Sequence, residues 1–354
     1  MLFRGAFKTL LVAICGTISG DHILLLDGIP TIYMAYAAVF AGIAGLIWSA
    51  DRFVAGAGAF ALNFGISPMI IGLTIVSFGT SAPEVLVSLS ASFSGAGDIA
   101  VGNALGSNVA NIGLVLAVTA LIARIPVQKH ILKDELPILV LITVLAGIFL
   151  FDAKLSRVEG WILLLSLIPA MAFIVWRKKT SISDKEKEEE EDIQSMGNGP
   201  AIAWFFIGLG LLIGSSKILV WGAQTTAEHF EVSPLIIGLT VLAIGTSLPE
   251  LAASVASALK GMHEIALGNV IGSNLFNLLA VMSLPGIINP SSYDAEVFSR
   301  DYLTMAAFTF GVSLLILVAL RFRGENAYIG RISGSILLLS YLAYILVLFR
   351  ATAS

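Results

Sequence analysis

Long runs of apolar residues, separated by short polar segments, recur along the whole chain of 354 residues. A helix needs roughly 20 mostly apolar residues to cross a bilayer, and most of these runs reach that length. They are continuous rather than alternating at every second residue, which disfavours the strands of a membrane barrel. The pattern predicts ten spanning helices, near residues 33–60, 66–93, 98–122, 135–151, 157–176, 201–228, 232–259, 264–289, 302–321 and 328–349.

The composition supports a membrane protein. Hydrophobic residues make up 57% of the chain and charged residues 12%, against about 25% charged residues in an ordinary soluble domain. The mean hydropathy is +0.93. The single cysteine, Cys15, excludes a disulfide within the chain. We therefore predict an all-α polytopic membrane protein.

Two segments fall outside the predicted helices. Residues 180–199 belong to the only long polar stretch, and we interpret them as an acidic cytoplasmic linker between a first half, 31–179, and a second half, 200–354. A role for this linker as a calcium sensor is disfavoured, because it lacks the spaced Asp, Asn and Gly of a calcium loop. For residues 1–30, a cleaved signal, a retained extra helix and a non-functional extension all stay open.

The distribution of positive charge predicts the orientation of the chain. If the first main span enters from outside, most lysines and arginines fall on the cytoplasmic side, as the positive-inside rule requires. The N-terminus of the main bundle is therefore expected to face outward. The basic residues on the predicted cytoplasmic side are Arg124, Lys129, Lys133, Arg177, Lys178, Lys179, Lys185, Lys187, Lys260, Arg321 and Arg323.

An internal repeat organises the sequence. Residues 67–111 align without a gap with residues 233–277, and 22 of 45 positions are identical. The matches concentrate in polar and small residues, such as "GTSAPE" with "GTSLPE" and "VGNALGSNVAN" with "LGNVIGSNLFN". Five predicted spans separate each feature from its copy, an odd number, so the second half crosses the membrane in the opposite sense. Inverted repeats of this kind are typical of secondary transporters, whose broken helices meet at the midplane.

Each repeat places a glutamate inside an apolar segment, next to a proline. Pro83 and Pro249 lack an N–H group and displace the carbonyl one turn earlier, so kinks are expected near Gly79 and Gly245. The freed carbonyls are tolerable in a membrane only where they line a cavity or bind a ligand. At helical spacing, hydroxyl groups form a column that ends in each glutamate, and a second stripe follows on the next helix. The resulting candidate site residues are Ser77, Thr80, Ser81, Glu84, Ser107 and Asn111, with Ala243, Thr246, Ser247, Glu250, Ser273 and Asn277 in the second repeat.

The ligand atoms of this predicted site are oxygens, which favours a hard cation. Calcium accepts six to eight oxygen ligands in a loose geometry, whereas magnesium requires an octahedron and keeps its waters. Two glutamates neutralise one Ca²⁺, and Na⁺, which has a similar size, would compete for the same oxygens. No Cys or His converges there, so a zinc or copper site is disfavoured. His263 with Glu264 lacks the second histidine of a metalloprotease motif, and we interpret the pair as a loop feature.

The paired "GTSAPE/GTSLPE" and "GSN" motifs resemble the alpha repeats of the sodium/calcium exchanger family, within the cation/calcium antiporter superfamily. The resemblance is strongest over residues 67–113 and 233–279, and the short linker resembles the bacterial branch. It implies about ten helices in two inverted five-helix repeats, with Glu84 and Glu250 as the central calcium ligands and the other candidate residues around sodium and calcium sites. It also implies exchange of several Na⁺ per Ca²⁺ in a bacterial inner membrane, with these two ions and lipid as partners, no cofactor and no nucleic acid.

Other functions are weighed against this one. A Ca²⁺/H⁺ antiporter is the nearest alternative, since the same glutamates could exchange protons, but relatives of that kind carry a different acidic motif after "GN". A cation channel would usually build its filter around a symmetric pore. A membrane hydrolase is disfavoured because the sequence lacks HExxH and G-x-S-x-G motifs, so no enzyme is expected. Asn277 stands where potassium-dependent relatives carry Asp, which argues against a potassium requirement. The oligomeric state is open, and a monomer is compatible with this function.

Overall fold

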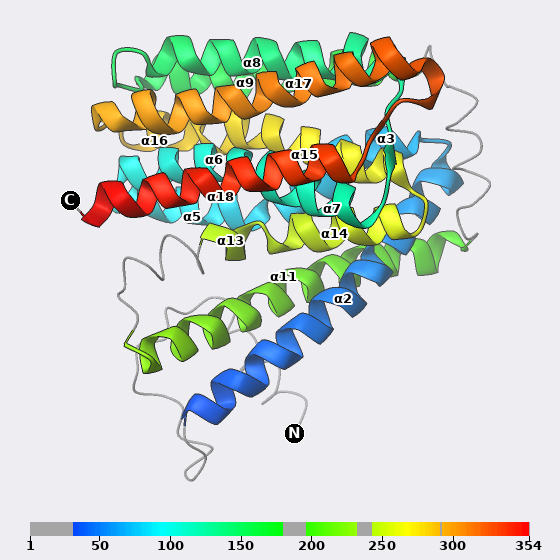
Figure 1. Cartoon of the computed structure of the whole chain (residues 1–354), viewed down its shortest axis with the longest axis horizontal. Coiled ribbons are helices and arrows are strands. Elements are labelled where there is room, and N and C mark those ends of the chain that lie inside the picture. The colour runs from blue at the N-terminus through cyan, green and yellow to red at the C-terminus, as the bar shows by residue number, and fades with distance from the viewer. Residues whose placement is uncertain (1–30, 180–195, 232–242, 291, 354) are drawn as a thin grey trace.

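The computed structural model describes residues 31–179, 196–231, 243–290 and 292–353. The predicted N-terminal segment 1–30, nearly all of the acidic linker and the start of the second repeat lie outside these described residues. The described chain is helical apart from its connections and one pair of two-residue strands. Figure 1 shows most of the helices running side by side along the long axis of the molecule, with α2 and α11 at a slant to them.

The described part of the first half begins with a long helix and continues as several broken ones. Its elements, in chain order, are α2 (Thr31–Phe64), α3 (Pro68–Ile71), the π-helical turn η1 (Gly72–Val76), α4 (Ser77–Thr80), α5 (Ala82–Phe93), α6 (Gly97–Ala110), η2 (Asn111–Leu116), α7 (Ala117–Ile122), β1 (Ile125–Pro126), η3 (Ile131–Glu135), α8 (Leu136–Leu150) and α9 (Arg157–Lys179).

The helices of the second half follow a similar order where it is described, but its short strand lies before the last helix rather than after the third helical segment. Its elements are α11 (Asn198–His229), α13 (Ala243–Thr246), α14 (Leu248–Leu259), α15 (His263–Phe276), η5 (Asn277–Val281), α16 (Ser283–Ile288), η6 (Val297–Tyr302), α17 (Leu303–Arg323), the short turn η7 (Gly324–Asn326), β2 (Tyr328–Ile329) and α18 (Arg331–Ala353).

Several of these helices can cross a membrane. Seven are long and apolar enough within the described residues, and the broken pair Pro68–Thr80 and Ala82–Phe93, bent by 45°, makes an eighth. The chain is therefore a multi-pass membrane protein. The described helices lie within a few residues of the apolar runs identified in the sequence. Ten spans stay a prediction, because residues 232–242 are not described and α8, with 15 residues, is shorter than the other spanning helices.

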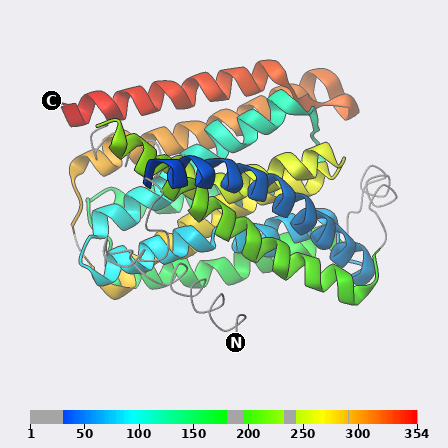
Figure 2. The same cartoon turned by 90° about the horizontal axis from the view of Figure 1, so that it is seen from below.

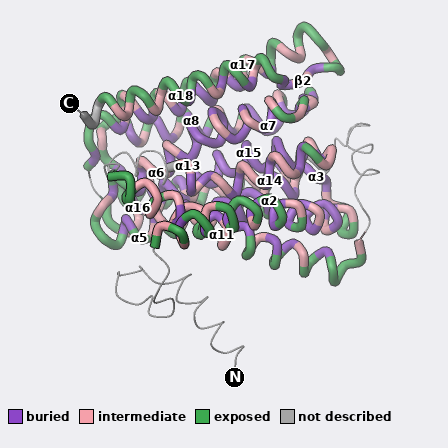
Figure 3. The backbone as a smooth tube through the Cα atoms, turned by 60° about the horizontal axis from the view of Figure 1, so that its bottom comes forward, coloured by how far each residue is buried: buried purple, intermediate pink, exposed green. Residues whose placement is uncertain are grey.

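The spanning helices differ greatly in their exposure. In the segment His263–Ile288, 94% of the apolar window is buried inside the protein, and in Gly97–Ile122 the fraction is 72%. For α2, α11 and α18 the fraction is between 17% and 28%. Figure 3 shows α15 buried among its neighbours, whereas the outer side of α18 is largely exposed. The two central segments are thus shielded from lipid, and they carry the second stripe of each predicted site.

Helices α2 and α11 pack side by side and cross the other helices at a slant (Figures 1 and 2). Glycines allow their backbones to approach closely. A Cβ on Gly208 would lie 2.7 Å from the Cα of Phe53, and one on Gly222 would lie 2.6 Å from the carbonyl oxygen of Ala35. Small residues at such positions are what brings membrane helices into contact, since lipid provides no hydrophobic force between them.

A polar cluster joins the two halves at one end of the bundle. His130, in the connection between α7 and α8, lies 3.2 Å from Glu135 through Nδ1 and 3.5 Å from Glu264 through Nε2. Gln128 donates a hydrogen bond of 2.9 Å to the same Glu264 carboxylate. The interpretation of His263 and Glu264 as a loop feature was wrong: both belong to the first turn of α15, and Glu264 is buried against the first half.

The charge of this cluster predicts how stability depends on pH. Burial alone would lower the pKa of His130, but hydrogen bonds to Glu135 and Glu264 and the attraction of their charges outweigh it and raise that pKa to about 9. A histidine whose pKa is raised on folding stabilises the protein fully below its unfolded pKa of roughly 6.5. That contribution disappears as the pH rises through 9.

We expect the unfolding temperature of the purified protein to fall between pH 7 and pH 10, and this fall to shrink in His130→Gln. Thermal unfolding in detergent across this range measures both profiles. His229→Gln, which changes an exposed histidine at the end of α11, is the control and should keep the wild-type profile. Parallel pH profiles for the wild type and His130→Gln would show that the buried cluster does not hold a charged histidine.

Candidate functional site

Both glutamates lie in the first turn of a short helix that begins at a break. Ser81 has φ −81° and ψ 7° between α4 and α5, and Ser247 has φ −88° and ψ 4° between α13 and α14. Each break is followed by a proline in the first turn, a position that requires no backbone N–H donor. The unpaired N–H groups at a helix start carry partial positive charge, which favours a carboxylate there. The sequence therefore places Glu84 and Glu250 at two equivalent helix starts.

The two carboxylates are buried, and hydroxyl groups contact them. Glu84 and Glu250 are each 1% exposed. The Ser81 hydroxyl donates a hydrogen bond of 2.9 Å to Oε1 of Glu250, and Ser107 donates one of 3.5 Å to Oε1 of Glu84. Ser81 of the first repeat thus binds the acid of the second repeat, and the two motifs form one site.

Many polar atoms of the site have no hydrogen-bond partner within the described residues. The second carboxylate oxygen, Oε2, of both Glu84 and Glu250 is buried without a hydrogen-bond partner among these residues. Leaving such groups unpaired in an apolar interior costs about 1–3 kcal/mol each. A bound cation would satisfy the oxygens among them. The other atoms of this kind at predicted site residues are Oγ of Ser247 and Ser273 and both side-chain polar atoms of Asn111 and Asn277.

The remaining predicted residues are placed as follows. Ser77 and Thr80 are buried, and Ser77 donates back to the carbonyl of Leu73 at 2.6 Å. The single hydroxyl proton of Thr80 is shared between the carbonyl of Val76 and Oδ1 of Asn269, both at 3.1 Å. A hydroxyl that donates in this way still has lone pairs with which to bind a cation. Thr246 is half-buried in α13. Ala243 begins α13, but its side chain is not among those described.

Two asparagines that were not predicted as site residues bind the backbone of the glutamates. Asn103 donates a hydrogen bond of 3.1 Å to the backbone carbonyl of Glu84, and Asn269 donates one of 3.3 Å to that of Glu250. Asn269 also donates to Ser254 at 2.9 Å and accepts a bond of 3.1 Å from Thr80. Both asparagines follow glycine in the repeated "GN" pair, and this recurrence could have identified them from the sequence.

A second pair of asparagines connects the repeats directly. The side chain of Asn108 donates a hydrogen bond of 3.2 Å to the backbone carbonyl of Asn274, and these residues are separated by 166 positions, the offset of the repeat. A residue that contacts its own equivalent lies near the axis relating the two copies. Both asparagines are fully buried. The repeats therefore meet between α6 and α15.

The site depends on two carboxylates and on neutral oxygens. Within the described residues, no group of three or more His, Cys, Asp or Glu side chains is placed to hold a metal ion. Carboxylate, hydroxyl and amide oxygens are the ligands of hard cations such as Ca²⁺. The chemistry of these groups thus suits a hard divalent cation, or monovalent cations that replace it.

Comparison with known proteins points to one family. A model of the sodium/calcium exchanger protein family matches residues 34–176 and 200–350. The putative antiporter CaxA of Alkalimonas amylolytica is 47% identical over 316 residues, 88% of this chain and 98% of the relative. The inner membrane protein YrbG of Escherichia coli is 41% identical over 278 residues, 77% of this chain and 85% of the relative. A structure of the sodium-calcium exchanger NCX_Mj, soaked with zero Na⁺ and Ca²⁺, matches with a TM-score of 0.76 and 28% identity, covering 90% of this chain and 99% of that chain.

We expect Asn269→Ala to lower the free energy of unfolding by about 1–3 kcal/mol, because it leaves the Glu250 carbonyl, Ser254 and Thr80 without this partner in the interior. Thermal unfolding in detergent measures the effect. The control is Asn63→Ala, which removes an exposed hydrogen bond of 2.8 Å to Met196 and should change stability by less than about 0.5 kcal/mol. Equal losses in the two variants would contradict the buried role of Asn269.

Proposed function

Because the chain belongs to the sodium/calcium exchanger family, we propose that it couples the movement of Na⁺ in one direction to the movement of Ca²⁺ in the other. The resemblance seen in the paired motifs is thereby confirmed at the level of the family, and cation/Ca²⁺ antiport follows from it. Na⁺ as the coupling ion, and Glu84 with Glu250 as the ion site, are the finer parts of this proposal.

The observation that carries the proposal is the state of the two glutamates. Each is buried, bound at one oxygen by a serine hydroxyl, and without a partner at the other oxygen among the described residues. The two negative charges of the ionised carboxylates are balanced by one Ca²⁺ or, when Ca²⁺ is absent, by monovalent ions that enter the same site. Occupation by one kind of ion therefore excludes the other, which is the requirement for exchange.

The repeated architecture supports alternating access. The bend of 45° between Pro68–Thr80 and Ala82–Phe93 places a helix break beside Glu84, and Ser247 marks an equivalent break beside Glu250. The bond between Asn108 and Asn274 supports a twofold relation between the repeats. Two inverted five-helix halves, 31–179 and 200–354, would open the same central site to either side by rocking against each other.

The names of similar proteins support the choice of ions. The NCX_Mj chain is called a sodium-calcium exchanger, and one of its matching structures was soaked with both Na⁺ and Ca²⁺. The same glutamates could carry protons, so a Ca²⁺/H⁺ antiporter is the alternative that an experiment must separate. The name of the Escherichia coli relative and the bias of basic residues support an inner-membrane location with the start of α2 outside.

The proposal predicts Ca²⁺ uptake driven by sodium. Purified protein in liposomes loaded with Na⁺ and diluted into sodium-free buffer containing Ca²⁺ should accumulate Ca²⁺, because outward Na⁺ movement supplies the free energy. Liposomes without a sodium gradient, given an outward proton gradient instead, should take up little. Protein-free liposomes under both gradients are the control. Uptake driven by the pH gradient in the complete absence of Na⁺ would refute sodium coupling and favour the proton antiporter.

A further inference from the structure

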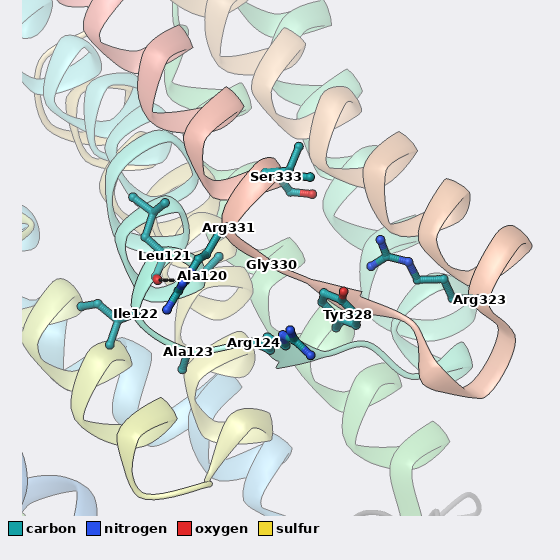
Figure 4. A pocket seen from close by; sticks show the side chains of 11 residues that line it. Ala120, Leu121, Ile122, Ala123, Arg124, Arg323, Tyr328, Gly330, Arg331 and Ser333 are labelled. Atoms are coloured by element: carbon teal, nitrogen blue, oxygen red, sulfur yellow. Dashed lines mark hydrogen bonds between the residues drawn. The ribbon is translucent and has the colours of Figure 1, made fainter.

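A pocket of about 340 Å³ lies where α7 ends and α18 begins, away from the central glutamates. Three arginines from three different segments line it (Figure 4): Arg124 follows α7, Arg323 ends α17 and Arg331 begins α18. The exchange reaction proposed above uses none of them. Three guanidinium groups around one cavity therefore indicate a ligand other than the exchanged cations.

The arginines are held in place by neutral groups. The Arg323 guanidinium carbon lies 4.2 Å from the centre of the Tyr328 ring, and that of Arg124 lies 5.2 Å from it. Arg331 donates a hydrogen bond of 3.3 Å from Nε to the carbonyl of Leu121. The Tyr328 backbone is fixed in turn by the pairing of β2 with β1, in which it lies opposite Pro126.

This pocket gathers positive charge without a balancing acid. Among the described residues, none of the three arginines forms a salt bridge, and the nearby Glu325 lies 3.8 Å from Lys129 instead. The start of α18, a helix of 23 residues, adds N–H groups that carry partial positive charge. Like charges held around one cavity favour an anion between them. Guanidinium groups bind phosphate with paired hydrogen bonds, a geometry that lysine lacks.

Exposed apolar side chains line and flank the pocket. Ile122 and Ile332 line it and are 46% and 79% exposed, and Phe322, next to Arg323, is 83% exposed. In a multi-pass membrane protein, apolar side chains exposed beside arginines indicate the boundary between acyl chains and headgroups. A ligand with a phosphate group and an apolar part matches both the arginines and the exposed apolar side chains of this pocket.

We propose that the pocket formed by Arg124, Arg323 and Arg331 binds a phosphate group, supplied by an anionic phospholipid or by soluble phosphate. The bound group would connect the end of α7 to the start of α18. Helix α7 continues the central segment that carries Asn111, so such a ligand would also brace one of the helices of the ion site.

The test compares ligands by their effect on the unfolding temperature of the purified full-length protein in detergent. The probes are short-chain phosphatidylglycerol, short-chain phosphatidylcholine and inorganic phosphate, each titrated at constant ionic strength. The pocket variant is Arg124→Gln with Arg323→Gln. Its control is Lys133→Gln with Lys154→Gln, which removes the same charge from exposed positions outside the pocket and leaves the Lys129–Glu325 pair intact. Ser333→Trp, which fills the pocket and keeps every charge, is a second pocket variant if the first does not fold.

We expect saturable stabilisation by phosphatidylglycerol, weakened roughly tenfold in apparent affinity in the pocket variants and unchanged in the lysine control. Stabilisation by the anionic lipid alone identifies a lipid headgroup as the source, whereas equal stabilisation by inorganic phosphate identifies a soluble ligand. If phosphatidylcholine acts as well as phosphatidylglycerol, or if the pocket variants respond like the lysine control to every probe, the pocket is not a phosphate site and the proposal fails.

Discussion

Two negative charges inside a membrane-embedded protein are the constraint on which this structure depends. An isolated carboxylate is very costly to bury in an apolar medium, and two that repel each other are worse. Glu84 and Glu250 nevertheless lie at 1% exposure. The interior compensates with helix starts behind each acid, hydroxyl donors in front and asparagines that fix the backbone. The remaining charge is left for a cation.

The same constraint explains why the central helices are broken and surrounded. A break frees backbone groups that lipid cannot satisfy, so it must be enclosed by protein. The segments with the breaks pack against Gly97–Ile122 and His263–Ile288, which are themselves largely buried. The intact helices α2, α11 and α18 face outward. Apolar composition alone makes all of these segments look alike, and burial separates them into a polar interior and a lipid-facing exterior.

The sequence predicted most of what depends on local pattern. Apolar runs predicted the helices, and the recurrence of "GTSAPE" and "GTSLPE" singled out both glutamates and predicted kinks one turn before the prolines beside them. The structure describes a bend of 45° in the first of these segments, between Thr80 and Ala82. Contacts between segments far apart in the chain were not predictable in this way. Asn103 and Asn269 repeat as clearly as the glutamates, but their bonds to glutamate carbonyls need the folded arrangement. Glu264 was misread because its partner His130 lies 134 positions earlier, and no local pattern connects them.

The central claim is that the two glutamates together bind Ca²⁺, and calorimetric titration of Ca²⁺ into the purified protein without Na⁺ tests it most directly. Glu84→Gln and Glu250→Gln should each weaken binding more than roughly 100-fold, because loss of one charge beside a divalent ion costs several kcal/mol at the effective dielectric of a protein interior. Glu228→Gln, at the exposed end of α11, should bind as the wild type does. Wild-type affinity in a folded Glu84→Gln or Glu250→Gln protein would contradict the account.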